Sequence, residues 1–158
     1  LYGVLPVAGY YTMRTSWTDP DAVYLFLDGS RQPVVSHQDF DALHVDLFAY
    51  GRDFLPDKGT FTYGGEYHKA AKATKNHSTV TIDDRNQKDV PAVLHGRMAE
   101  KAFGFVDCSQ QGSPEVKHRR QALLVRPDDG MAPYVVLVDR ITGKGSHTAD
   151  QYFHLPPG

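Results

Sequence analysis

The stretch Ala22-Val23-Tyr24-Leu25-Phe26-Leu27-Asp28-Gly29 decides the fold class of this chain. An unbroken apolar and aromatic run reaches Leu27, and the Asp-Gly pair then signals a turn. A run of this length between turn residues is typical of a β-strand rather than of a helix. Because the run is apolar on both faces, we expect the strand to be covered on both sides, as in stacked sheets.

Similar short runs recur along the chain between its fourteen glycines and ten prolines. Tyr134-Val135-Val136-Leu137-Val138-Asp139 is again apolar on both faces, and no segment sustains a long helical period. About eight to ten such strands predict an all-β protein, an antiparallel sandwich or barrel, and the two-faced runs favour a β-sandwich of stacked sheets with little or no helix. The one helix-like stretch is 66–75. The other predicted strands are residues 10–15, 45–50, 77–83, 92–106, 121–126 and 146–155.

The size and charge of the chain limit the functions that it can have. Its 158 residues suffice for one core, and no internal repeat or linker divides them, so we expect a single domain over residues 1–158. The formal net charge of −2 argues against a nucleic-acid binder that neutralises phosphates. The sequence has no run of about 18 apolar residues and so no predicted helical membrane span. The single cysteine, Cys108, excludes an intrachain disulfide framework.

The segment Ser36-His37-Gln38-Asp39-Phe40-Asp41-Ala42-Leu43-His44-Val45-Asp46-Leu47 concentrates two histidines and three aspartates between apolar strands. Two further polar pieces follow, Leu55-Pro56-Asp57-Lys58-Gly59-Thr60 and Asn76-His77-Ser78-Thr79-Val80. Imidazole and carboxylate groups are ligands that first-row dications prefer, and a sandwich brings separate strands together. The spacing alone leaves open the alternative that these residues form turns or solvated strand ends.

Taken together, the motifs resemble the β-sandwich domain of the heparinase II/III-like polysaccharide lyases. The segment 36–43 is similar to the family's Ser-His-x-His-x-Asp-Ala-Leu motif, and His77-Ser78-Thr79-Val80 is similar to its His-Asn-Thr-Val motif. The resemblance covers nearly the whole chain in order. The other similar pieces are Gly9-Tyr10, Arg14-Thr15-Ser16-Trp17, Asp28-Gly29, Tyr50-Gly51-Arg52, Leu55-Pro56-Asp57-Lys58-Gly59-Thr60, Tyr63, Asp83, Gln87, residues 136–140 and Phe153-His154-Leu155.

The resemblance implies part of a lyase that cleaves 4-linked uronate polysaccharides, such as heparin, heparan sulfate or alginate, by β-elimination. In such lyases a helical toroid precedes the sandwich and supplies the catalytic tyrosine and the group that neutralises the uronate carboxylate. The chain starts at Leu1 without an initiator methionine, and we interpret it as a fragment that lacks this toroid. The expected partners are an acidic uronate polysaccharide and the toroid, and the expected location is periplasmic or secreted.

The resemblance also assigns roles to individual residues. His37 matches the catalytic histidine that faces the uronate. Asp57 and His77 match two ligands of a divalent metal, and Asp39 stands where the family has a histidine as third ligand. This oxygen-richer set still suits zinc, and it also suits manganese or calcium. The residues expected to bind substrate are Tyr63, Tyr67 and Arg52.

Other residues are expected to be structural. We expect Trp17 to pack in the core, His44 to be packed in a strand, and Cys108 to be a partly buried thiol. The run His118-Arg119-Arg120 reads as a solvated strand end. Two alternatives to a lyase stay open: a non-catalytic carbohydrate-binding sandwich in which Trp17 and tyrosines stack on sugars, and a structural domain without a working metal site.

Overall fold

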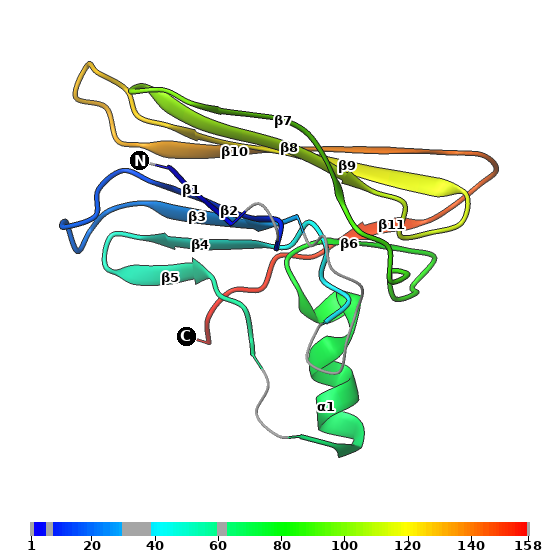
Figure 1. Ribbon diagram of the computed structural model, residues 1–158. Coiled ribbons are helices and arrows are strands. Elements are labelled where there is room, and N and C mark those ends of the chain that lie inside the picture. The colour runs from blue at the N-terminus through cyan, green and yellow to red at the C-terminus, as the bar shows by residue number, and fades with distance from the viewer. Residues whose placement is uncertain (1, 6–7, 30–38, 60–62, 158) are drawn as a thin grey trace.

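The computed structural model describes residues 2–5, 8–29, 39–59 and 63–157 (Figure 1). Antiparallel strands dominate this part of the chain, and the helix α1 (Gly65–Lys72) and the 3-10 turn η1 (Thr74–Asn76) accompany them. The prediction of an all-β chain with little helix is confirmed. The strands are β1 (Tyr2–Leu5), β2 (Tyr10–Arg14), β3 (Tyr24–Asp28), β4 (Val45–Ala49), β5 (Arg52–Leu55), β6 (Val80–Ile82), β7 (Val93–Ala99), β8 (Phe103–Gln110), β9 (Val116–Val125), β10 (Tyr134–Gly143) and β11 (Ala149–Gln151).

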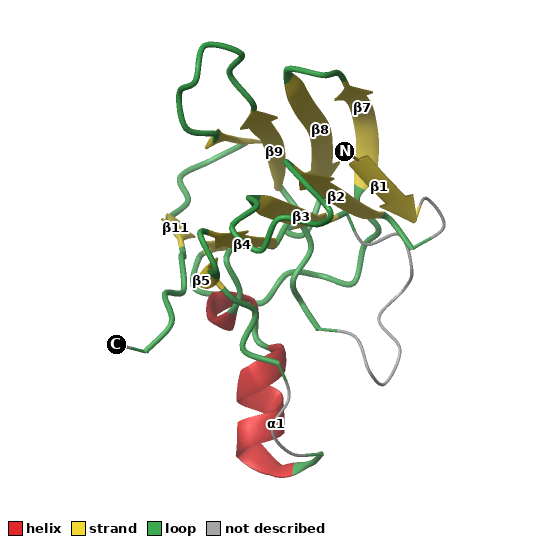
Figure 2. Cartoon of the chain, turned by 90° about the vertical axis from the view of Figure 1, so that its left-hand side faces the viewer, coloured by secondary structure: helices red, strands yellow, loops and turns green. Residues whose placement is uncertain are grey.

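The strands form two stacked sheets and a two-stranded ribbon. The five-stranded sheet has the order β1-β2-β3-β4-β5, the four-stranded sheet has the order β10-β9-β8-β7, and β11 pairs with β6. All these pairings are antiparallel. Figure 1 shows the four-stranded sheet lying over the five-stranded one, and Figure 2 shows α1 projecting below both layers. The predicted sandwich of stacked sheets is therefore confirmed.

The core lies between the two sheets, because alternate side chains of a strand point to opposite faces. Burial alternates strictly along β9, from buried Val116 to half-buried Val125. Cys108 belongs to this core and is fully buried, not partly buried as expected. The most buried members of the core are Tyr11, Met13, Leu25, Leu27, Val45, Val106, Ala122 and Leu124.

Gly29 shows why the Asp-Gly pair follows β3. Its amide donates a hydrogen bond of 2.9 Å to the Gly9 carbonyl. A Cβ atom at this position would lie 2.7 Å from the Tyr11 ring and 2.9 Å from the Gly9 carbonyl oxygen. A side chain at position 29 would therefore push β3 away from the start of β2.

The edge strand β10 corrects one expectation from the sequence. Val135 and Leu137 pack against the core, whereas Tyr134, Val136 and Val138 are 49%, 38% and 50% exposed. β10 is the outermost strand of its sheet, and no described element forms a second layer over its outer face (Figure 1). The apolar run thus predicted the strand correctly, but the expected second layer over its outer face is not there among the described residues.

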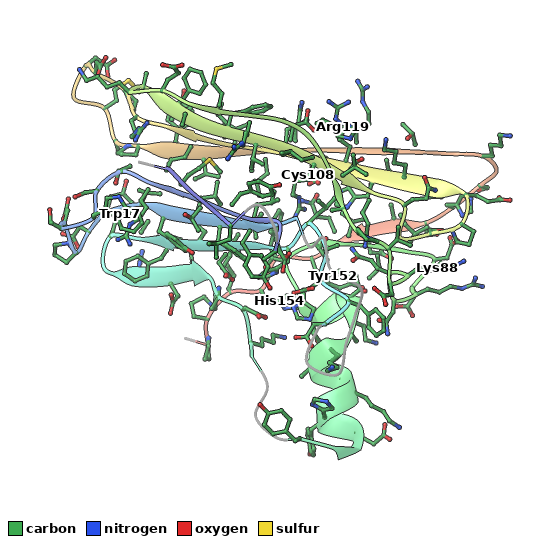
Figure 3. All side chains as sticks on the ribbon, in the orientation of Figure 1. Trp17, Lys88, Cys108, Arg119, Tyr152 and His154 are labelled. Atoms are coloured by element: carbon green, nitrogen blue, oxygen red, sulfur yellow. The ribbon has the colours of Figure 1, made fainter. Side chains whose placement is uncertain are left out.

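Trp17 corrects a second expectation. It lies in the loop between β2 and β3, where it is 56% exposed, so the predicted packing in the core is wrong. The Arg14 guanidinium lies 4.6 Å from the centre of the Trp17 ring and 5.6 Å from the centre of the Tyr24 ring. A cation therefore holds the indole at the surface. Figure 3 shows Trp17 at one end of the sandwich, away from α1.

The helix α1 lies on the surface and has no buried residue. Glu66 and Lys69 form an exposed ion pair on it, and the carbonyl of Lys72 accepts a hydrogen bond of 3.0 Å from the Phe40 amide. The last contact ties the end of α1 to the residues that precede β4. The expected helix-like stretch 66–75 is thus helical, first as α1 and then as η1. Neither described helix has the length and apolar character of a membrane span.

Candidate functional site

Two segments that are distant in sequence form most of the candidate site, and Asp57, which follows β5, completes it. The β4 segment, residues 39–46, leads into β4, and the β6 segment, residues 77–79, leads from η1 into β6. Within the β4 segment, Leu43 is fully buried and has the left-handed φ of 65°, which is unusual for a leucine. Its amide donates to the Asp28 carbonyl at 2.7 Å, and the Asp28 amide donates to the His44 carbonyl at 2.9 Å. The end of β3 therefore fixes the backbone of the β4 segment.

Side-chain hydrogen bonds join the two segments to each other. The Ser78 amide donates to His44 Nδ1 at 2.8 Å, so this nitrogen carries no proton and Nε2 carries one. His44 Nε2 donates in turn to Asp46 Oδ1 at 2.8 Å. The Thr79 hydroxyl donates to the Ala42 carbonyl at 3.0 Å. His44 is packed, as predicted, and it holds the β6 segment in place.

His77 lies between two carboxylates. Its side chain is 2% exposed, and Asp57 Oδ1 lies 3.2 Å from Nδ1 while Asp39 Oδ2 lies 4.0 Å from Nε2. The ring of His44 meets the ring of His77 edge to face, with the centres 5.6 Å apart. Asp39, Asp57 and His77 were predicted together from motifs spread over 39 positions, and the structure brings them into one cluster.

The charges of this cluster influence one another. Burial lowers the pKa of His77, but the contact with Asp57 and the charges of Asp41 and Asp39 outweigh burial, so the pKa is raised. The contact with His77 lowers the pKa of Asp57 to about 2. Burial raises the pKa of Asp39 and of Asp41. The same negative surroundings that favour a proton on His77 also favour a divalent cation at this place.

The donor atoms suit a metal in part. Both ring nitrogens of His77, and Asp39 Oδ1, are buried without a hydrogen-bond partner. His77 Nδ1 and Asp57 Oδ1 are 3.2 Å apart but are not aligned as a hydrogen bond. Their separation is close to the roughly 3.4 Å expected between two ligand atoms of one tetrahedral zinc ion. No three His, Cys, Asp or Glu side chains of the described residues are arranged to hold one metal ion together. Asp57 and His77 therefore fit, whereas a third ligand is not in place.

The comparisons with known proteins extend over the whole chain. The family model described as heparinase II/III-like, C-terminal matches residues 2–158. The chain belongs to this family. A heparin-sulfate lyase of Pedobacter heparinus is 27% identical over 153 residues, which are 94% of this chain and 22% of that protein. A heparin-sulfate lyase of Bacteroides thetaiotaomicron is 29% identical over 162 residues, and these cover 96% of this chain and 22% of that protein.

A solved structure supports the same relation. The crystal structure of heparan sulfate lyase HepC from Pedobacter heparinus has a TM-score of 0.88 and 27% sequence identity, and the match covers 99% of this chain and 24% of that chain. The chain thus spans about a fifth of the length of the curated relatives that it resembles. The resemblance inferred from the motifs is confirmed.

The other predicted site residues have different outcomes. His37 lies outside the described residues. Tyr63 and Tyr67, before and within α1, are 79% and 84% exposed. Arg52 begins β5, where it is exposed and lies 4.9 Å from the centre of the Phe54 ring. These three side chains are accessible to a ligand, and their role in binding substrate stays a prediction.

The structure overturns the expectation of a solvated strand end at His118-Arg119-Arg120. His118 is 5% exposed and Arg120 is fully buried, and only Arg119 faces outward (Figure 3). His118 Nε2 lies 2.6 Å from Asp139 Oδ1, and Arg120 forms a two-point ion pair with the same carboxylate. The sequence contained one signal, because His118 and Arg120 are in phase with Val116, Ala122 and Leu124 on the inward face of β9.

The C-terminal segment after β11 also contacts the β6 segment. The Tyr152 amide donates to the Thr79 carbonyl at 3.0 Å, and the His154 amide lies 3.4 Å from the Ser78 hydroxyl oxygen. The rings of Tyr152 and His154 stack in parallel planes with their centres 6.1 Å apart (Figure 3). The predicted strand at 146–155 is therefore shorter, and its last residues cover the backbone next to His77.

Proposed function

We propose that this chain is the β-sandwich part of a polysaccharide lyase that acts on 4-linked uronate glycans such as heparin or heparan sulfate. The observation that carries the proposal is the match over 99% of the chain to a heparan sulfate lyase, at 27% identity and a TM-score of 0.88. Since the chain spans 22% of the lyases' length, the proposal includes a helical toroid as partner domain. An enzyme for intact polysaccharides is expected in the periplasm or outside the cell.

The proposed reaction is a β-elimination. A base removes the C5 proton of the uronate, the electrons of that bond form the C4–C5 double bond, and the C4–O bond breaks while an acid protonates the leaving oxygen. The C5 proton is weakly acidic, so the adjacent carboxylate has to be neutralised while charge develops. A tyrosine or histidine serves as base and acid, and one such group contributes about 10²–10⁴-fold. We assign the uronate-facing histidine to His37 on the family resemblance alone.

We propose that Asp57, His77 and Asp39 hold a divalent metal, with zinc as first choice and manganese or calcium as alternatives. Asp57 and His77 Nδ1 are the ligands that the geometry supports, whereas Asp39, which lies beside the other ring nitrogen, is assigned on the family resemblance alone. Two observations support this assignment: buried His77 Nδ1 has no hydrogen-bond partner and lies 3.2 Å from Asp57 Oδ1, and the carboxylate of Asp57 is ionised. A bound cation would supply fixed positive charge that joins the β4 and β6 segments. The expected role of these three side chains is to keep the β4 segment in one arrangement.

We propose that three exposed residues, Arg52, Tyr63 and Tyr67, bind the substrate. A guanidinium pairs with sulfate or carboxylate groups, and tyrosine rings stack on sugars and donate a hydroxyl. Their exposure supports contact with a polymer rather than with the protein interior. Substitution of each by alanine in the intact protein is expected to raise KM more than it lowers kcat.

The function is tested in the intact protein by incubating it with heparan sulfate and measuring the ultraviolet absorbance of unsaturated uronate. Cleavage is expected, and hydrolysis without a new double bond, or no cleavage, would contradict a lyase. Metal content is measured by elemental analysis after dialysis without chelator, and about one equivalent per chain is expected.

The metal ligands are tested by Asp57→Ala and His77→Ala. Each variant is expected to lose the bound metal and to melt at a lower temperature than the unsubstituted protein. Asp53→Ala and His95→Ala are matched controls, because both residues are exposed on strands and neither belongs to the cluster. Unchanged metal content in both ligand variants would refute the assignment.

A non-catalytic carbohydrate-binding domain is the second candidate function. The exposed indole of Trp17, held by the Arg14 guanidinium, favours it, because such a ring presents an apolar face to sugars. This candidate predicts that the intact protein binds an acidic glycan without cleaving it and that Trp17→Ala weakens binding at least about tenfold. Cleavage by the Trp17→Ala variant at the unsubstituted rate would contradict it.

A further inference from the structure

Arg120 is a buried cation that reaches from the four-stranded sheet to the candidate site. It lies in β9 and is fully buried. Its Nε donates to Asp139 Oδ1 at 2.8 Å and its Nη2 donates to Asp139 Oδ2 at 3.0 Å, so the pair is bidentate. Asp139 lies on the neighbouring strand β10, directly opposite Arg120 in the pairing register.

The third nitrogen of the guanidinium joins the two site segments. Arg120 Nη1 donates to the Leu43 carbonyl at 2.7 Å and to the Ser78 carbonyl at 2.7 Å. Leu43 belongs to the β4 segment, which carries Asp39, and Ser78 follows His77 in the β6 segment. One nitrogen atom therefore joins the two backbones that present Asp39 and His77.

The peptide groups of Ser78 are held from two sides. Its amide donates to His44 Nδ1, as described, and its carbonyl accepts from Arg120. The first bond comes from the β4 segment, whereas the second comes from the opposite sheet. Ser78 is itself fully buried, so no water replaces a lost partner at low cost.

Only an arginine can make this set of contacts. A guanidinium has five N–H donors in a fixed plane, and four of them are used here, two on Asp139 and two on the backbone carbonyls. A lysine has one nitrogen and cannot reach a carboxylate and two carbonyls at these positions at once. Asp139 is fixed as well, because His118 and Gln151 also bond to it.

We propose that Arg120, oriented by Asp139, is a positioning residue that fixes the β4 and β6 segments relative to each other and so sets the arrangement of Asp39 and His77. This inference rests on the proposed function for its effect on turnover. It does not place Arg120 in contact with substrate. A purely structural arginine would contribute to folding stability and nothing else, so the test separates stability from local arrangement.

The test uses Arg120→Lys and the double variant Arg120→Met/Asp139→Asn in the intact protein. The double variant leaves no unpaired charge in the core, which allows it to fold even where a single deletion does not. Leu124→Ala is the matched control, because it removes a buried side chain from the same face of β9 without removing a hydrogen bond to either segment. All variants are compared at a temperature at which each is folded by circular dichroism.

The first readout is amide hydrogen exchange by mass spectrometry, which needs no activity. Peptides that cover residues 39–46 and 77–82 are expected to exchange at least about tenfold faster in both Arg120 variants, and at the unsubstituted rate in Leu124→Ala. Equal exchange of these peptides in the Arg120 variants and in the unsubstituted protein would overturn the proposal. So would an acceleration spread evenly over the whole chain, because that pattern indicates lost global stability.

The second readout is turnover on heparan sulfate. A displacement of about 1 Å in a site lowers kcat on the order of 10²-fold, so kcat is expected to fall about 10- to 100-fold in the Arg120 variants while KM changes less than about twofold. Leu124→Ala is expected to keep kcat. Unchanged kcat in a folded Arg120→Lys variant would overturn the proposal. If the unsubstituted protein is inactive, the proposed lyase function is refuted, and the exchange experiment alone decides the role of Arg120.

Discussion

Arg119 and Arg120 are neighbours in sequence, and they have opposite environments in the fold. The side chain of Arg119 is 37% exposed on the outer face of β9, where it pairs with Asp107 on β8. The side chain of Arg120 is fully buried on the inner face, where it pairs with Asp139 and with two backbone carbonyls. Both pairs are bidentate ion pairs between adjacent strands, and Arg120 makes its two bonds to backbone carbonyls in addition.

The comparison shows that the contribution of a buried or exposed arginine to stability depends more on its partners than on its charge. Asp107 is buried, but water and salt screen the partly exposed Arg119 and Gln121 also donates to the carboxylate at 2.9 Å, so this pair is expected to contribute less to stability than the inner pair. Arg120 has no water to replace a lost partner, and removal of one member of such a buried pair leaves an uncompensated charge. The inner arginine therefore connects the two sheets, whereas the outer arginine bonds only within its own sheet.

The largest expected effect breaks the inner pair. Arg120→Met leaves the Asp139 carboxylate without its cation and two buried carbonyls without donors, so the free energy of unfolding is expected to fall by about 3–5 kcal/mol. Urea unfolding followed by circular dichroism measures it, with Arg119→Met as the control on the same strand. A loss no larger than that of the control would show that the position in the sheet does not decide the contribution.

A second prediction uses pH to sharpen the comparison. Burial raises the pKa of Asp139, but hydrogen bonds from His118 and Arg120 outweigh burial and lower the pKa to about 2, from 3.8 in the unfolded chain. A carboxyl with a lower pKa in the folded state stabilises the fold above the unfolded value, and this stabilisation is lost as the pH falls towards 2. The unsubstituted protein is expected to lose roughly 2 kcal/mol from this group across that range.

Asp139→Asn checks this pH dependence, because the variant has no carboxyl to titrate there. Its free energy of unfolding is expected to be lower than that of the unsubstituted protein at pH 7 and to fall less steeply below about pH 4. Asp53→Asn, on an exposed position of β5, is the matched control and keeps the steep loss. Equal slopes for Asp139→Asn and the unsubstituted protein would contradict the assignment of the low pKa.

The smallest expected effect concerns the outer pair. Arg119 lowers the pKa of Asp107 by pairing with it, but the guanidinium is open to solvent. Arg119→Met is expected to lower the melting temperature by no more than about 1–2 °C in low salt, and added salt should reduce the difference further. A larger shift, or one that salt does not change, would mean that the outer pair acts like the inner one.

Much of the fold was predictable from local patterns. The run that ends at Asp28-Gly29 predicted β3, the run from Tyr134 predicted β10, and turn residues marked the boundaries between strands. The Asp-Gly pair has a further reason that the sequence does not show, since Gly29 lies against Tyr11. Periodicity reports which residues share a face, but it does not report which faces meet another layer, and for this reason the exposed outer side of β10 and the exposed Trp17 were predicted wrongly.

The candidate site was predictable to a similar extent. The resemblance to the family's motifs singled out Asp39, Asp57 and His77, and the structure places the two carboxylates on either side of the His77 ring. The role of Arg120 was not predictable in the same way. Its partners are the backbone carbonyls of Leu43 and Ser78, which are 77 and 42 positions away from it in the sequence. No side-chain motif records a hydrogen bond to a carbonyl, since every residue type carries that group.

The sequence by itself determined that this chain forms short antiparallel strands, belongs to the heparinase II/III-like C-terminal family and carries an imidazole and carboxylates at defined motif positions. Only the tertiary structure decided which of two adjacent arginines is buried and which backbones it joins. The physical reason is that strand propensity and motif chemistry are local, whereas burial depends on a second sheet that approaches from elsewhere in the chain. A buried charge is then fixed by the partners that this approach brings within hydrogen-bond distance.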